Sequence, residues 1–153
     1  MPKVGETARR SRLVTKRDIE LLRRSLATPT KEPVPALPAR ASPVELTGDR
    51  NPLHYDERRA AKTRFGGLIV QGGITSGLLN AVVAEELPGP GSVFLHADWS
   101  FKAPVRPGDE ITAEVEVIEV REDKPLTKLR TTVMNQEGEV VLDGTALVWT
   151  EPV

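Results

Sequence analysis

Residues 72–87 of this chain read Gly-Gly-Ile-Thr-Ser-Gly-Leu-Leu-Asn-Ala-Val-Val-Ala-Glu-Glu-Leu, and this stretch decides the fold. Its residues are apolar or small almost all the way round a helical period, and Pro88-Gly89-Pro90-Gly91 ends the run. A helix that is apolar on every side is a buried one, so other elements have to cover it. The glycines at its start let a second backbone or a ligand approach N–H groups that lack partners within the helix and carry a partial positive charge.

The residues that follow this helix alternate between apolar and polar with a period of two, which is typical of strands. The expected strands cover residues 92–105, 110–121, 126–136 and 140–150, and the last two form a hairpin around Glu137-Gly138. On the first strand the alternation places Val93, Leu95, Ala97, Trp99 and Phe101 on one face, and on the second it points Ile111, Ala113, Val115 and Val117 inward. This order predicts an α+β fold in which a long antiparallel sheet curls round one central buried helix.

Upstream of the helix, residues 47–56 read Thr-Gly-Asp-Arg-Asn-Pro-Leu-His-Tyr-Asp and carry an acid and a base five residues apart. Pro52 fixes its own φ and disfavours the α region at Asn51, so Asp49 and His54 flank a turn that presents both side chains to the same side. An Asp and a His placed in this way can grip one water, so the turn is a candidate catalytic site. Taken alone, the pattern is equally typical of a capped turn with a satisfied histidine.

The first part of the chain divides into two segments. Thr15 and the apolar spacing after it predict a capped amphipathic helix over about residues 16–26, and five prolines then mark residues 27–43 as an extended linker or loop. We therefore expect an N-terminal segment over residues 1–22, a Pro-rich insertion or linker over 23–44, and the folded core over 45–153.

Length, charge and composition favour a small single domain. The chain has 153 residues, a formal net charge of −1, 39% hydrophobic residues and no cysteine. No apolar run approaches the ~20 residues that a membrane-spanning helix requires, and a chain without cysteine has no disulfide, thiolate metal ligand or cysteine nucleophile. The basic first forty residues lack the interleaved aromatics or reading motif of a nucleic-acid binder, so we expect no nucleic-acid partner, no membrane association and a cytoplasmic location.

Four motifs, in order, resemble those of the MaoC-like dehydratases, the single-domain (R)-specific enoyl-CoA hydratases. They are Thr47 to His54, then residues 63–72 (Thr-Arg-Phe-Gly-Gly-Leu-Ile-Val-Gln-Gly), then 87–92 (Leu-Pro-Gly-Pro-Gly-Ser), then Phe101-Lys-Ala-Pro-Val105 with Gly108-Asp109. The resemblance covers about residues 45–151 and, more weakly, 3–22. It implies a hot-dog fold, a homodimer whose two sheets join edge to edge, and reversible syn addition of water to a trans-2-enoyl thioester, giving an (R)-3-hydroxyacyl product.

The resemblance also implies a role for individual residues. Asp49 and His54 become the acid–base pair that activates water, with Asn51 steadying the turn and the backbone N–H of Gly72 as the oxyanion donor. The family needs neither a metal nor a separate cofactor, because coenzyme A, or a carrier protein, belongs to the thioester substrate. In the familiar hydratases a serine on the central helix supports the pair, and its position here is Asn80, which is expected to take over that support through its amide.

Two departures from the pattern of the hydratase family keep other functions open. One is Asn80 in place of the supporting serine, and the other is the Pro-rich stretch, which stands where relatives run directly from the N-terminal helix into the Thr-Gly-Asp turn. Both departures suit a non-catalytic or partner-dependent hot-dog subunit that binds acyl thioesters. A hot-dog thioesterase shares the fold but usually carries a carboxylate on or near the central helix. The candidates here, Glu85 and Glu86, lie at the far end of that helix from Gly72, which makes the thioesterase the weaker alternative.

Overall fold

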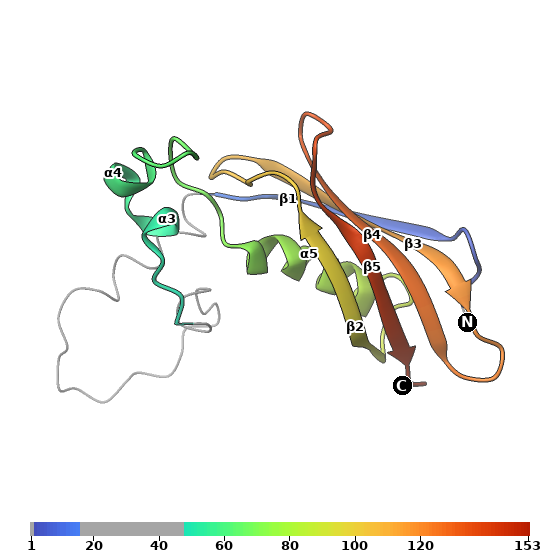
Figure 1. Ribbon diagram of the computed structural model, residues 1–153. Helices are drawn as coiled ribbons and strands as arrows, with labels where there is room; N and C mark the ends of the chain where they lie inside the picture. Colours follow the sequence, from blue (N-terminus) through green and yellow to red (C-terminus); the bar gives the residue numbers. More distant parts are fainter. Residues whose placement is uncertain (1, 16–47) are drawn as a thin grey trace, which may run out of the picture.

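The computed structural model describes residues 2–15 and 48–153, which form a curved antiparallel sheet with one long helix against its concave side (Figure 1). The sheet has five strands in the order β1-β3-β4-β5-β2. The strands are β1 (Thr7–Leu13), β2 (Ser92–Phe101), β3 (Glu110–Val120), β4 (Leu126–Asn135) and β5 (Val140–Thr150). The helices are α3 (Pro52–Tyr55), α4 (Glu57–Ala60) and α5 (Gly72–Glu85). The expected helix over residues 16–26 and the Pro-rich stretch 23–44 lie wholly outside the described residues.

Helix α5 packs against the sheet, as residues 72–87 predict, but the single chain does not cover it on every side as that stretch led us to expect. Its buried side chains recur at helical spacing and face the sheet; they are Thr75, Leu78, Leu79, Val82 and Val83. Opposite them, Gly73, Gly77 and Asn80 are exposed in the single chain. One chain therefore covers one face of this helix and leaves a second face of small residues open.

The sheet supplies the other half of the core. Ile111, Ala113, Val115 and Val117 of β3 are completely buried, as their alternation predicts. Glu114 and Glu116 point to the opposite face, where Glu114 pairs with Arg9 of β1 and Glu116 pairs with Arg130 of β4. The period of two thus separates an apolar face that packs on α5 from a face laced with ion pairs.

Strand β2 departs from simple alternation, and the prediction of one apolar face through Val93 and Leu95 is wrong. The register against β5 shifts between Phe94 and His96, which leaves an extra residue in β2. Such a bulge reverses the faces on one side of it, because successive side chains point in opposite directions. Phe94 and Trp99 therefore pack against the core, with ring centroids 5.8 Å apart, while Val93 and Leu95 are 55% and 56% exposed.

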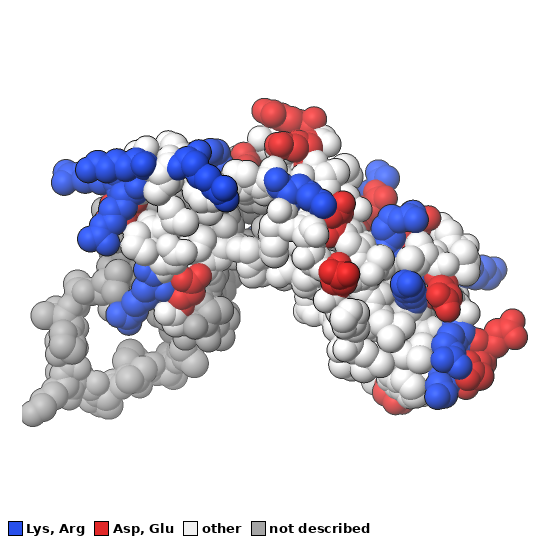
Figure 2. All heavy atoms as spheres, in the orientation of Figure 1, with Lys and Arg blue, Asp and Glu red and all other residues white. Residues whose placement is uncertain are grey.

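Charged side chains are unevenly distributed over the visible face. Figure 2 shows Lys and Arg gathered over the end of the molecule where α3 and α4 lie. The exposed basic residues of this end, which we call the basic cluster, are Arg58, Arg59, Lys62 and Arg64. The turn that carries Asp49 and His54, which we call the acid–base turn, lies at the same end of the protein.

Candidate active site

The turn around Pro52 is built from two short helices with side-chain caps. Asn51 caps α3 by accepting a hydrogen bond from the N–H of Leu53 at 3.1 Å, and Pro52 occupies the first helical position, where no N–H is needed. Asp56 caps α4 in the same way, accepting from the N–H of Arg59 at 3.1 Å. Side-chain caps on both helices therefore hold the backbone on either side of His54.

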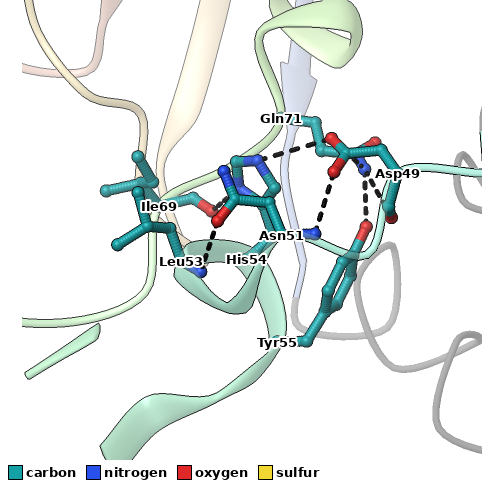
Figure 3. Close-up of polar contacts among 7 residues, drawn as sticks. All are labelled: Asp49, Asn51, Leu53, His54, Tyr55, Ile69 and Gln71. Atoms are coloured by element: carbon teal, nitrogen blue, oxygen red, sulfur yellow. Dashed lines mark hydrogen bonds and ion pairs between the residues drawn. The ribbon is translucent and has the colours of Figure 1, made fainter. Parts of the chain in front are cut away.

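The turn brings Asp49 and His54 together, as Figure 3 shows. Asp49 Oδ2 lies 3.6 Å from His54 Nε2, and Asp49 Oδ1 accepts a hydrogen bond from the N–H of Asn51 at 2.9 Å. The histidine is only 9% exposed, whereas the aspartate side chain is 39% exposed. The pair therefore has one buried member and one member within reach of solvent.

A backbone contact orients the imidazole of His54. Its Nδ1 lies 2.8 Å from the carbonyl oxygen of Ile69. A carbonyl oxygen only accepts hydrogen bonds, so Nδ1 carries the hydrogen and, in the neutral ring, Nε2 presents a lone pair toward Asp49. At 3.6 Å, Nε2 and Oδ2 are too far apart for a good direct hydrogen bond. Two acceptors at this spacing suit a single water that donates one hydrogen to each.

Two residues that the sequence did not single out complete the network. The side chain of Gln71, at 7% exposure, donates from Nε2 to Asp49 Oδ2 at 3.0 Å and to the Tyr55 hydroxyl at 2.5 Å. Burial raises the pKa of Tyr55 to about 12, and the negative charge of Asp49 adds to the rise while the hydrogen bond from Gln71 opposes it. Tyr55 therefore stays protonated throughout the neutral range.

Gly72 begins α5 directly after Gln71, the N-cap residue of that helix. A Cβ on Gly72 would lie 3.0 and 3.1 Å from two ring atoms of Phe101, so the position is tight for any side chain. Its N–H belongs to the first turn of the helix, where amides have no intrahelical acceptor. Because Gln71 contacts Asp49, the helix start lies beside the acid–base pair.

Asn80 is placed differently from the other predicted site residues. It is exposed on α5, eight residues beyond Gly72, which is about 12 Å along a helix that rises 1.5 Å per residue. The contacts that join Asp49, His54, Tyr55 and Gln71 do not include it. Its supporting role stays a prediction.

The described residues contain no group of three or more His, Asp or Glu side chains that could hold a metal ion. In the same part of the chain, no helix is long and apolar enough to cross a membrane.

Comparison with known sequences places the chain in a family. The sequence profile of the MaoC like domain matches residues 22–139. The chain belongs to the MaoC-like family. This membership agrees with the resemblance of the four sequence motifs.

Curated relatives are close in sequence to this MaoC-like chain. A 3-hydroxybutyryl-CoA dehydratase of Methylorubrum extorquens is 47% identical over 105 residues, which cover 69% of this chain and 66% of the relative. An (R)-specific enoyl-CoA hydratase of Aeromonas caviae is 46% identical over 103 residues, covering 67% of this chain and 77% of the relative. The first match thus spans just under two thirds of the relative's own length.

Solved structures of two R-hydratases agree with the fold of this MaoC-like chain. An (R)-hydratase from A. caviae involved in PHA biosynthesis superposes with a TM-score of 0.79 at 35% identity, covering 98% of each chain. An R-hydratase from Pseudomonas aeruginosa in the unliganded form gives a TM-score of 0.78 at 31% identity, covering 99% of this chain and 84% of that one. The predicted α+β hot-dog fold is confirmed.

Proposed function

We propose that this MaoC-like protein catalyses the reversible syn hydration of a trans-2-enoyl thioester to an (R)-3-hydroxyacyl thioester, as a hydro-lyase. The observation that carries the proposal is the 3.6 Å separation between Asp49 Oδ2 and His54 Nε2, with the opposite ring nitrogen engaged by Ile69. The activities named for the relatives from M. extorquens and A. caviae support the same reaction class.

The chemistry requires an acid and a base on one water. In hydration, a water held between Asp49 and His54 gives one proton to the pair while its oxygen forms the bond to C3 of the substrate. The π electrons of the C2=C3 bond shift toward the thioester carbonyl, and C2 then takes the proton that the pair holds. Both new bonds form on the side of the substrate that faces Asp49 and His54, which gives syn addition.

The start of α5 supplies the complementary charge. Negative charge develops on the thioester oxygen as the enolate forms, and the backbone N–H of Gly72 is our proposed donor to that oxygen. Asn51 keeps the turn in place through its cap on α3 and its backbone N–H to Asp49. Asn80 lies roughly two helical turns beyond Gly72, and we propose that it supports the pair through its side-chain amide.

The acyl carrier is proposed to be coenzyme A. The two relatives of highest identity given above are named for CoA thioesters, whereas an acyl-carrier-protein dehydratase of Solanum lycopersicum is 36% identical over 104 residues. The basic cluster lies at the same end as the acid–base turn and suits the phosphates of coenzyme A. No cofactor beyond the substrate's own carrier is proposed.

We further propose that the protein is a homodimer. Strand β2 is an edge strand, and Val93, Leu95 and Phe101 on it are each more than half exposed. An exposed strand edge with large apolar side chains is a ready pairing surface. Edge-to-edge pairing of two β2 strands would continue the sheet across both copies. The cytoplasmic location stays a prediction.

The deciding experiment follows the ultraviolet absorbance of crotonyl-CoA mixed with purified protein, with chiral analysis of the product. Loss of the conjugated signal with an (R)-3-hydroxy product is expected. Loss of the signal with release of free coenzyme A and no 3-hydroxy product would favour a thioesterase. An unchanged signal without thiol release, from folded dimer, would favour the non-catalytic subunit, and recovery of turnover on mixing with an active homologue would support that alternative.

A further inference from the structure

The side-chain carboxamide of Gln71 is buried beside Asp49, although the proposed reaction gives it no role. Although Gln71 is the N-cap residue of α5, its side chain makes no capping bond to that helix. It turns instead into the turn before α3, where it is 7% exposed and donates to Asp49 and to Tyr55. A buried amide is costly unless its hydrogens are satisfied, so these two bonds decide where the side chain lies.

These bonds fix the rotation of the Asp49 carboxylate. Oδ1 is held by the N–H of Asn51 at 2.9 Å, and Oδ2 is held by Gln71 Nε2 at 3.0 Å. The oxygen that Gln71 holds is the one that faces His54 Nε2. The Asp49 side chain is 39% exposed. Removing the Gln71 donor takes away the hydrogen bond on Oδ2, so we expect the carboxylate to turn about χ2 while Oδ1 keeps its bond to Asn51.

Tyr55 fixes the other hydrogen of the same amide nitrogen. Its hydroxyl oxygen lies 2.5 Å from Gln71 Nε2, and its ring meets the ring of His54 edge-on with centroids 5.8 Å apart. Tyr55 thus links the amide that holds Asp49 with the imidazole opposite that aspartate (Figure 3). One buried side chain and one phenol tie both members of the acid–base pair into a single unit.

We infer that Gln71, with Tyr55 behind it, is a positioning residue that aims Asp49 Oδ2 at the water shared with His54. The inference rests on the proposed hydratase function. Gln71 touches neither water nor substrate in this role, and it acts through Asp49. The same residue precedes Gly72, so it also sets the carboxylate against the helix start that is proposed to bind the thioester oxygen.

The test uses Gln71→Met, which keeps the length of the side chain and removes both N–H donors. We expect kcat for crotonyl-CoA hydration to fall about 10-fold while KM changes less than about 2-fold, because a positioning hydrogen bond to a charged group acts on the transition state rather than on thioester binding. Gln136→Met is the matched control, since Gln136 bonds Asp109 and Glu110 in a different part of the sheet. The control should leave both constants unchanged.

Two further variants separate positioning from general packing. Gln71→Glu should lose more turnover than Gln71→Met at pH 8 and recover part of it toward pH 6, because the introduced carboxyl can donate to Asp49 only when it is protonated. In an Asp49→Asn background, Gln71→Met should cost less than about 2-fold, since its target charge is gone. A full 10-fold loss in that background would overturn the inference.

The position of the Asp49 carboxylate in crystal structures tests the inference without relying on turnover. Crystal structures of the wild type and Gln71→Met should show the Asp49 carboxylate rotated away from His54 in the variant. An unmoved carboxylate at the same separation would overturn the inference even if the wild-type protein hydrates crotonyl-CoA. A rotated carboxylate in a protein without hydratase activity would instead leave the positioning role standing and refute the proposed function.

Discussion

The apolar core and the acid–base turn are held together by different physics. Around α5, fully buried side chains such as Leu79, Val82 and Ile111 pack through many weak, non-directional contacts. In the turn, a few directional bonds of 2.5 to 3.0 Å hold Asp49, His54 and Gln71. The core therefore supplies most of the stability, whereas the turn carries the proposed chemistry, so we expect substitutions in the two regions to have separable effects.

Leu79→Ala is expected to have the largest effect, and it tests the core. Leu79 is completely buried on α5, and replacing a buried leucine with alanine removes apolar contacts and leaves a cavity. Chemical denaturation should show a loss of about 3 kcal/mol in the free energy of unfolding, with kcat at low temperature within about 2-fold of wild type. Glu85→Ala, exposed on the same helix, is the control and should stay within about 0.5 kcal/mol.

Asp49→Asn is the opposite test. The amide keeps the shape of the side chain but cannot act as a base, so kcat for crotonyl-CoA should fall at least ~100-fold, while the thermal midpoint stays close to wild type. Asp123→Asn, in the turn between β3 and β4 where Asp123 pairs with Arg121, is the control and should retain full turnover. An unchanged kcat/KM for Asp49→Asn would remove Asp49 from the mechanism.

Leu95→Lys tests whether two copies of the chain pair through the exposed apolar side chains of β2. Leu95 is 56% exposed on the edge strand β2, and a charge there should oppose pairing of two copies. Sedimentation should show a dimer dissociation constant at least about 10-fold higher than that of wild type, equivalent to ~1.4 kcal/mol. Val4→Lys, at an exposed position away from β2, should leave the constant unchanged, and equal constants for both variants would exclude the β2 edge as the interface.

Tyr55 gives the finest test, because it is the one tyrosine of the chain and reports on the turn through its phenolate absorbance. Its pKa of about 12 exceeds the ordinary 10.0, chiefly through burial and secondly through the charge of Asp49. Asp49→Asn should lower the midpoint only in part, because burial remains. A midpoint at the ordinary value in folded wild-type protein would contradict the described environment.

The same pKa shift has a consequence for stability. A folded-state pKa above the unfolded value means that the folded protein holds the proton more tightly. The contribution of Tyr55 to stability is therefore fully present below pH 10 and is lost as the pH rises through about 12. Tyr55→Phe should flatten this part of the stability profile measured by urea denaturation.

The sequence predicts the two regions unequally. Alternation and helical spacing are local signals, so α5, β3 and the turn at Glu137-Gly138 could be placed from the sequence, and Gly138 indeed has φ of 80°. The bulge in β2 could not be placed, because it depends on the register with β5. The paired positions of Asp49 and His54 followed from Pro52 for a similar local reason.

Gln71 and Tyr55 were missed for a different reason. Their bond joins positions 16 residues apart, and the bond from Gln71 to Asp49 spans 22. No periodicity or spacing rule marks a glutamine before a glycine-led helix as a partner for a distant carboxylate. One signal in the sequence could have identified Gln71. A long polar side chain between the apolar Val70 and the start of the central helix is expected to be buried and therefore needs a hydrogen-bond partner.

The long loop that the pairing of β1 with β3 closes suggests when β1 joins the sheet during folding. The bonds of the acid–base turn close loops of 22 residues or fewer, whereas Thr7 of β1 lies opposite Glu116 of β3, more than a hundred positions along the chain. Closing the longer loop costs more chain entropy. We therefore expect β1 to join the sheet after β3, β4 and β5 have assembled, and the amides of β1 to exchange with solvent faster than those of β4.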